Sequence, residues 1–308
     1  MIGLGINVPN FGPETDLEAL LGWAGFAEGN GFTVLVVSDH VAPTPEVSAV
    51  YPAPFYDPFI LLTWLAGQTT TVRLGTSVVV LAYRHPLLTA RMSAMVHLMS
   101  GGRFVLGAGT GWAGTEFAAL GLDVTTRART ADAYLDVITR AWAHETVSAD
   151  ADGLRFRDVA TGPRPPGGQV PLWIGGAGRA AIRRAARFGT AWHPINPELT
   201  WLRDIGVPAL AEASATVDRP TPDLVPRIKA RLQAERAPAN RPLGVGTLEQ
   251  VVDDVVALAG TGATEVILDT NPDTPRPRDF TTEQRHLLEI KDAYEQRGFD
   301  RSMTLPEH

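Results

Sequence analysis

The sequence predicts an α/β fold of the (β/α)₈ barrel type, in a single domain spanning residues 1–308. Short apolar runs rich in β-branched residues alternate eight times with stretches of helical periodicity, and the connections are short. A helix between two successive strands makes those strands parallel, with a right-handed crossover. Eight such units in 308 residues match the size of a (β/α)₈ barrel, and a doubly wound open sheet is the alternative.

The strands are predicted from apolar runs that suit burial on both faces of a parallel sheet. They are expected at Ile2–Val8, Thr33–Val37, Val72–Leu81, Arg103–Gly109, Leu172–Ile174, Thr190–Pro194, Leu224–Leu232 and Glu265–Leu268. The segment Leu224–Leu232 is ambiguous, because its alternating pattern suits a strand while its length also suits a short helix.

The helices are predicted from apolar spacing and from capping signals at their ends. They are expected at Thr15–Asn30, Pro58 to about Thr70, Pro86–Ser100, Arg129–His144, the residues after Gly178 up to Phe188, Asn196–Ser214, Thr247–Ala259 and Thr282–Arg297. Asp57-Pro58 is typical of a helix start, and Thr247 with Gln250 forms a capping box. We expect Gly206 and Pro208 to break the sixth helix.

Two segments depart from the alternation of strand and helix. Val41–Pro58 carries five prolines, which predicts an irregular loop after the second strand. Thr146–Val159 has the pattern of a β-hairpin with Asp152-Gly153 at its turn. The predicted fold is therefore a barrel with a small hairpin insertion after the fourth helix.

The composition excludes several classes of function. A net charge of −7 and a pI of about 5.5 argue against a nucleic-acid partner. The absence of cysteine excludes disulfides, thiolate metal sites and cysteine nucleophiles. The seven histidines are scattered without an H-E-x-x-H motif, so we expect no metal site. Without an apolar run of membrane-spanning length, and with Met1 leading directly into a strand, we expect a cytoplasmic protein with no membrane partner.

Polar and glycine residues gather where the predicted strands end. In a (β/α)₈ barrel the active site lies at the carboxyl ends of the strands. Asp39-His40 follow the second strand, Ser77-Val78 lie late in the third, and Gly175–Gly178 follow the fifth. The sequence therefore predicts a site that these residues share.

The fourth strand runs into a glycine-rich loop, RFVLGAGTGWAGTE. Gly109 and Gly111 let the backbone approach a flat cofactor, because glycine has no Cβ. The spacing of Gly109, Gly111 and Gly114 also matches the dinucleotide motif GxGxxG. A nicotinamide site is disfavoured, since the acidic residue that it needs is represented only by Asp132, inside a predicted helix. Ahead of the fifth helix, Gly175, Gly176, Ala177 and Gly178 are suited to bind a phosphate with free N–H groups, or to form a tight turn.

Five segments in order along the chain resemble the bacterial luciferase-like flavin oxidoreductases, and within them the branch that uses the deazaflavin coenzyme F420. They are Val34–Pro43 (VLVVSDHVAP), Arg73–Pro86 (RLGTSVVVLAYRHP), Leu98–Gly121 (LMSGGRFVLGAGTGWAGTEFAALG), Pro171–Pro194 (PLWIGGAGRAAIRRAARFGTAWHP) and Val245–Thr270. Residues 196–244 match only loosely. The resemblance implies a (β/α)₈ barrel that holds a flavin-like ring at the strand ends, with F420 as the cofactor and FMN as the alternative.

The resemblance also implies roles for individual residues. Asp39 would contact the deazaflavin, and His40 would face the substrate and move the proton that accompanies the hydride. A non-prolyl cis peptide at Ser77-Val78 would support the ring, and the turn Gly175–Gly178 would take the cofactor phosphate. Thr115 falls where F420 enzymes place a longer polar side chain on the ring edge.

One position departs from the family pattern. Trp112 stands where relatives that oxidise sugar phosphates carry a glutamate, which favours an apolar substrate. The implied function is hydride transfer between the C5 atom of the deazaflavin and a small organic substrate. An FMN-dependent monooxygenase and a non-catalytic flavin-binding barrel are the alternatives. Family members are commonly homodimers, so we expect one here.

Overall fold

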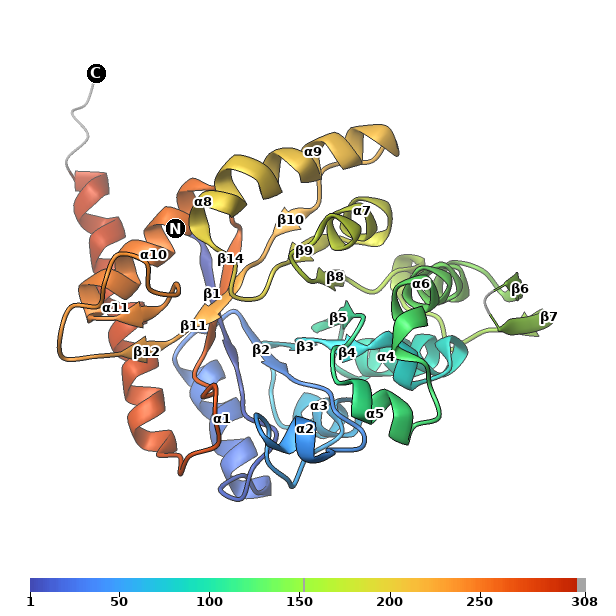
Figure 1. The fold of residues 1–308 in the computed structure, drawn as a ribbon, viewed down its shortest axis with the longest axis horizontal. Coiled ribbons are helices and arrows are strands. Elements are labelled where there is room, and N and C mark those ends of the chain that lie inside the picture. The colour runs from blue at the N-terminus through green and yellow to red at the C-terminus, as the bar shows by residue number, and fades with distance from the viewer. Residues whose placement is uncertain (152, 304–308) are drawn as a thin grey trace.

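Eight parallel strand units close into a barrel, which confirms the predicted fold class. The computed structural model describes residues 1–151 and 153–303. The barrel strands are β1 (Gly3–Asn7), β2 (Val34–Val37), β3 (Arg73–Thr76) continued by β4 (Val79–Val80), β5 (Phe104–Gly109), β8 (Leu172–Gly175), β9 (Ala191–His193), β10 (Asp223–Leu224) continued by β11 (Arg227–Lys229), and β14 (Glu265–Asp269). The ring closes because β10 pairs with β9 while β11 pairs with β14, which in turn pairs with β1 (Figure 1).

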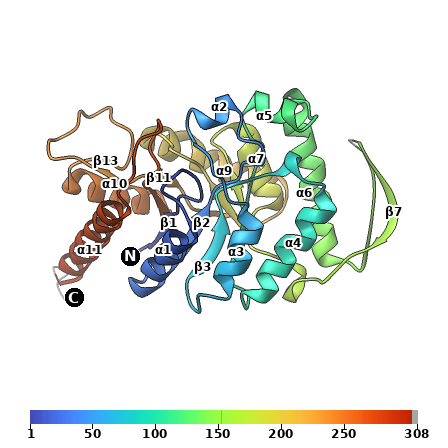
Figure 2. The same cartoon turned by 90° about the horizontal axis from the view of Figure 1, so that it is seen from below.

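Helices surround the outside of this ring (Figures 1 and 2). The longer ones are α1 (Leu17–Gly29), α3 (Pro58–Ala66), α4 (Pro86–Met99), α6 (Arg127–Ala143), α7 (Arg179–Phe188), α9 (Val207–Thr216), α10 (Leu248–Gly260) and α11 (Phe280–Met303). Three short helices, α2 (Pro45–Ser48), α5 (Gly114–Ala119) and α8 (Leu199–Trp201), lie in connections. Within residues 1–151 and 153–303, no helix is both long enough and apolar enough to cross a bilayer.

The strands are buried on both faces, as their apolar runs predict. In β2, Leu35 and Val37 belong to the large core between the sheet and the helices. Val34 and Val36 belong instead to a second cluster inside the barrel, with Ile267 of β14 among its members. This alternation follows from the two-residue period of a strand, and it fills the barrel interior with side chains.

The segment 224–232 is resolved as strand rather than helix. β10 and β11 are separated by Val225-Pro226, and Arg231–Leu232 forms a short strand, β12, that pairs with β13 (Val245–Gly246). Long-range pairing to β9 and β14 decides the conformation of this segment, which its local pattern leaves open.

The predicted break in the sixth helix does not occur. A π-helical turn at Leu202–Gly206 connects α8 to α9 without interruption. Gly206 keeps a helical backbone, and the Trp192 indole packs where a Cβ would lie, 2.7 Å away. Pro208 falls in the first turn of α9, where the wider turn before it tolerates the missing N–H group.

The hairpin insertion and the capping signals are confirmed. β6 (Thr146–Ala151) and β7 (Leu154–Ala160) pair antiparallel after α6 and protrude from the barrel (Figure 1). Gly153 has a φ of +81°, as the turn requires, and Asp152 lies outside the described residues. Thr247 and Gln250 form the predicted capping box of α10, and Asp57 caps α3.

Candidate functional site

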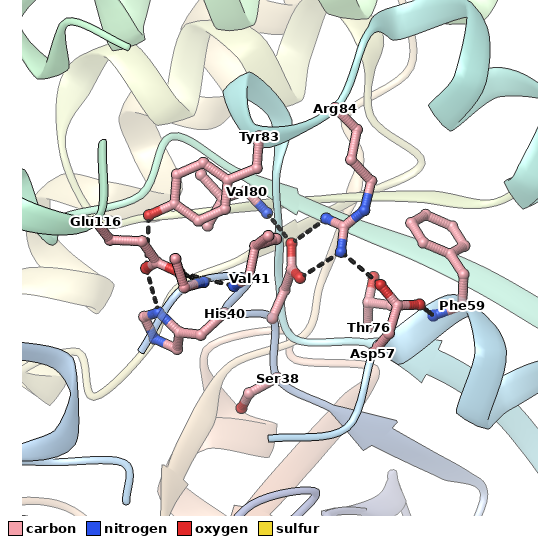
Figure 3. A network of polar contacts seen from close by, with 12 residues as sticks. Ser38, His40, Val41, Asp57, Phe59, Thr76, Val80, Tyr83, Arg84 and Glu116 are labelled. Carbon is pink, nitrogen blue, oxygen red and sulfur yellow. Dashed lines mark hydrogen bonds and ion pairs between the residues drawn. The ribbon is translucent and has the colours of Figure 1, made fainter. Parts of the chain in front are cut away.

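A histidine and a glutamate meet at the carboxyl end of β2. His40 is the third residue after β2, and Glu116 lies in the first turn of α5, within the glycine-rich loop after β5. The Nδ1 atom of His40 is 2.6 Å from Oε2 of Glu116. Figure 3 shows this carboxylate between His40 and Tyr83. The barrel thus joins two side chains that are 76 residues apart in the chain.

The Glu116 carboxylate is fully buried and surrounded by donors. The backbone N–H groups of Val41 and Ala42 donate to Oε1, at 2.7 and 2.9 Å. The Tyr83 hydroxyl donates to Oε2 at 2.8 Å. Burial acts to raise the pKa of Glu116, but the hydrogen bonds from His40 and the backbone outweigh it and lower the pKa below its ordinary value. Glu116 is therefore a carboxylate at neutral pH.

The charge of Glu116 fixes the tautomer of His40. An ionised carboxylate only accepts hydrogen bonds, so the proton between the two side chains belongs to Nδ1 of His40. The Nε2 atom then remains the position at which the imidazole takes up or releases a proton. This arrangement, a histidine oriented by a buried carboxylate, is suited to general acid–base chemistry.

Asp39 points into a second ionic cluster. Arg84 donates two hydrogen bonds to its carboxylate, at 2.7 and 2.9 Å, and a further one to Asp57. The Val80 N–H donates to Asp39 at 2.9 Å. Burial alone would lower the pKa of Arg84, but its bonds to Asp39 and Asp57 raise it. Figure 3 shows Arg84 beside Asp57. Both oxygens of Asp39 thus hold the segment after β3 in place.

The third strand is interrupted at Ser77-Val78, where the peptide bond is cis. Arg227 of β11 donates to the Ser77 carbonyl at 2.8 Å, and the Ser77 hydroxyl is 2.8 Å from Nε2 of His193. Asp269 of β14 pairs with Arg227 at 2.8 Å. A buried polar network across β9, β11 and β14 therefore holds this peptide.

His193 is neutral in this network. Its Nδ1 atom lies 2.6 Å from the Val225 carbonyl, which can only accept, so Nδ1 carries the proton and the Ser77 hydroxyl donates to Nε2. Burial lowers the pKa of His193 from 6.5 to about 4, and the nearby charge of Arg227 adds to this effect.

The Val78 side chain packs against the bare backbone of the glycine-rich segments. A Cβ on Gly109 would lie 2.6 Å from Val78, and one on Gly175 would lie 3.0 Å from it.

At the turn before α7, Gly176 has a φ of +109°, and Ala177 and Gly178 are not buried. Because the Gly178 carbonyl accepts from Ile182, the helix begins here and its first N–H groups have no acceptors within the helix.

Thr115 forms hydrogen bonds with the segment that follows β2. Its hydroxyl is 2.6 Å from a carboxylate oxygen of Glu46 and 2.6 Å from the Thr44 hydroxyl, so it ties α5 to the segment after β2. Gly111 has a φ of +76° and packs closely against Val80 and Phe117.

Aromatic rings enclose His40. The rings of Tyr51, Phe55 and Trp112 have centroids 5.2, 5.3 and 5.9 Å from that of His40. Phe11 of the β1–α1 connection packs against Tyr51 and Phe55. Trp112 is 48% exposed, which places it at the entrance. The proline-rich segment and the glycine-rich loop therefore form an apolar wall at the strand ends.

The sequence interpretation missed the role of Glu116. The only local signal is that a glutamate in the first turn of a short helix follows a glycine-rich loop. Its partners, the residues just after His40, are identified only by the closed barrel.

The closed barrel with a polar site at the carboxyl ends of its strands is the architecture of a (β/α)₈ enzyme. The model of the luciferase-like monooxygenase family matches residues 4–241. The chain belongs to this family, which confirms the resemblance seen in the sequence.

Relatives of known name include F420-dependent enzymes. The chain is 34% identical to an F420-dependent glucose-6-phosphate dehydrogenase of Beutenbergia cavernae, over 67% of this chain and 61% of that protein. It therefore spans less than two thirds of the length of that relative. Among solved structures, the monooxygenase RslO1 of Streptomyces bottropensis superposes with a TM-score of 0.79, at 21% identity, over 97% of this chain and 100% of that one. An F420-dependent secondary alcohol dehydrogenase superposes with a TM-score of 0.77, at 16% identity, over 95% and 99%. These two similarities establish the fold.

The neutral state of His193 predicts a pH dependence of stability. The unfolded chain takes up a proton at this residue below about 6.5, whereas the native state takes one up only near about 4. The native state therefore loses up to roughly 3 kcal/mol as the pH falls through this window. We expect the wild type to lose roughly 4 °C or more of melting temperature between pH 7.5 and 5.0 that His193→Gln does not lose. The exposed His144, changed to Gln, is the control and should keep the wild-type slope. Equal slopes in the wild type and His193→Gln would contradict the assignment.

Proposed function

We propose that this protein is an F420-dependent oxidoreductase that transfers a hydride between the deazaflavin and a small, uncharged organic substrate. The observation that carries the proposal is the buried His40–Glu116 pair at the strand ends, 2.6 Å apart. The family and its F420-dependent relatives support the choice of cofactor.

The residues around Val78 fit a flat ring with a phosphate. Gly109 and Gly175 make room for the Val78 side chain, which is half-buried and would be the apolar surface in contact with the ring. A Cβ on Gly178 would meet nothing within 4 Å, so the turn before α7 is open to a phosphate. Val78, Gly109 and the turn 175–178 would hold the cofactor. When bound, the deazaflavin supplies the hydride donor or acceptor at its C5 atom.

The protein supplies the proton and the orientation. Nε2 of His40 gives a proton to the substrate oxygen in the reducing direction and takes it back in the other. The Glu116 carboxylate stabilises the imidazolium form of His40 and keeps its ring fixed. The aromatic wall excludes water from this exchange.

Charge pairing around the strand ends favours an uncharged substrate. A phosphate group needs cations that are free to bind it. Here Arg227 is paired with Asp269, Lys229 lies 2.9 Å from Asp273, and Arg278 is paired with Glu283. Together with Trp112 beside His40, these pairs favour an apolar substrate over a sugar phosphate.

An FMN-dependent monooxygenase is the second candidate. The name of the family model and the similarity of fold to a monooxygenase support it. The same turn at Gly175–Gly178 suits the phosphate of either cofactor, so the choice depends on binding experiments. A non-catalytic flavin-binding barrel is the third candidate.

The cofactor assignment predicts selective binding. Fluorescence titration of the purified protein with F420 and with FMN, each oxidised and reduced, should give a lower Kd for F420. Gly178→Asp, which places a carboxylate beside the first N–H groups of α7, should weaken F420 binding at least tenfold. Preference for reduced FMN would shift the assignment to oxygen chemistry, and binding of neither would refute the phosphate turn.

The acid–base assignment predicts a loss of turnover with binding retained. With a substrate found in a screen of ketones, aldehydes and secondary alcohols, His40→Ala should lower kcat by about 10²- to 10⁴-fold. Glu116→Gln should lower it by about tenfold or more, because the carboxylate no longer supports the imidazolium. Both variants should bind F420 within about threefold of the wild type, and His144→Ala should match the wild type throughout. Retention of wild-type kcat in His40→Ala would exclude its role.

We further propose a homodimer formed through α3 and α4. Ile60 on α3 is 74% exposed, and Leu88, Met95 and Met99 on the adjacent α4 are also exposed. Sedimentation equilibrium should give about twice the chain mass of 33.1 kDa. The double variant Ile60→Glu, Met99→Glu should be monomeric, while Val217→Glu, at the exposed residue just after α9, should not change the mass. A monomeric wild type would refute the dimer.

A further inference from the structure

We propose that Tyr51 donates a hydrogen bond to the substrate oxygen, opposite Nε2 of His40. The site would then accept a substrate with a carbonyl or hydroxyl oxygen on an apolar, flat body. This inference rests on the proposed oxidoreductase function and adds a second polar contact to it.

Tyr51 is the aromatic residue around His40 that carries a hydroxyl. Its ring lies 5.2 Å from the His40 ring at an interplanar angle of 34°, so the two face each other obliquely. Phe55 and Trp112, the other rings against His40, provide apolar surface and an indole. On the other side, Phe11 meets the Tyr51 ring edge-on at 5.0 Å. Tyr51 is therefore held between Phe11 and His40.

The segment that carries Tyr51 is fixed to the rest of the barrel. Phe55 forms an antiparallel bridge with Phe11, and the Gly12 N–H donates to the Pro54 carbonyl at 2.9 Å. The Tyr51 N–H donates to the Val47 carbonyl at 2.8 Å, at the end of α2. Since the backbone is held on both sides, the ring keeps its place beside His40 before a substrate arrives.

The Tyr51 hydroxyl remains available for a ligand. Over residues 1–151 and 153–303, it makes no hydrogen bond, whereas the hydroxyl of Tyr56 donates to Thr15 and that of Tyr83 to Glu116. The phenol lies near enough to Arg227, Asp269 and Asp273 for their charges to act on it. Asp269 is the last residue of β14 and Asp273 lies in the connection after it, so the hydroxyl is at the carboxyl-end face of the barrel.

The phenol is a hydrogen-bond donor at neutral pH. Burial raises the pKa of Tyr51, and the carboxylates of Asp269 and Asp273 add to this while Arg227 opposes it. A protonated phenol donates to a carbonyl oxygen and keeps its own proton. The proton that moves is then the one at Nε2 of His40, and the role of Tyr51 is to hold the oxygen in line with it.

A purely structural role for Tyr51 is the alternative, because a phenyl ring would pack in the same place. The variant Tyr51→Phe separates the two roles, since it removes one oxygen and keeps the ring. Tyr56→Phe is the matched control, because its hydroxyl is already bonded to the Thr15 carbonyl at 3.2 Å. Melting temperatures of the two variants establish that both are folded.

The test measures ligand binding without turnover. The protein is loaded with oxidised F420, which carries no hydride to give, and is titrated calorimetrically with acetophenone and with ethylbenzene, which lacks the oxygen. We expect the wild type to prefer acetophenone. Tyr51→Phe should weaken acetophenone binding by about 3- to 10-fold, as for one neutral hydrogen bond, and leave ethylbenzene within about twofold. Tyr56→Phe should bind both as the wild type does.

Different results refute different proposals. If Tyr51→Phe weakens both probes equally, or neither, the hydroxyl does not contact the ligand and the inference on Tyr51 is wrong. The same holds if the wild type does not distinguish acetophenone from ethylbenzene. F420 fluorescence, recorded first for each protein, tests the proposed function separately: a wild type that does not bind F420 refutes that function.

Discussion

A single buried carboxylate connects the parts of the site. Glu116 accepts hydrogen bonds from His40, Tyr83 and the two N–H groups that follow His40. Burying an anion is costly unless its oxygens are fully bonded, and here donors from two segments meet that requirement. The segment after β2, the segment after β3 and the helix α5 therefore take positions that satisfy one charge. The orientation of His40 follows from this constraint.

A second buried polar network links three of the barrel strands. Arg227, Asp269 and Asn7 link β11, β14 and β1, and Arg227 also binds the Ser77 carbonyl. This network holds the interruption of the third strand at Ser77-Val78. The aromatic wall around His40 is separate, because it comes from the proline-rich segment and the glycine-rich loop. Two separate groups of residues therefore shape the site. Ionic pairs hold the barrel strands in position, and aromatic rings surround His40.

Local sequence patterns predict most of the fold, because β-branched runs and capping residues act within a few positions. Once the fold class is predicted, the site is expected at the carboxyl ends of the strands, where His40, Ser77 and Gly175–Gly178 lie. Other features depend on partners far along the chain. The pattern of 224–232 leaves its conformation open until β9 and β14 pair with it. Gly206 leaves room for the Trp192 side chain, and the role of Glu116 depends on a residue 76 positions away.

The aromatic residues around His40 and the ionic network across the strands come from different segments, so one can change without the other. Tyr51 and Phe55 belong to a connection held by bonds to the β1–α1 segment, away from the turn at Gly175–Gly178. An exchange of residues 49–55 for another sequence would alter the surroundings of His40 while the bonds from Thr44 and Glu46 to α5 stay intact. Replacement of one loop would therefore change the range of substrates while the barrel is retained.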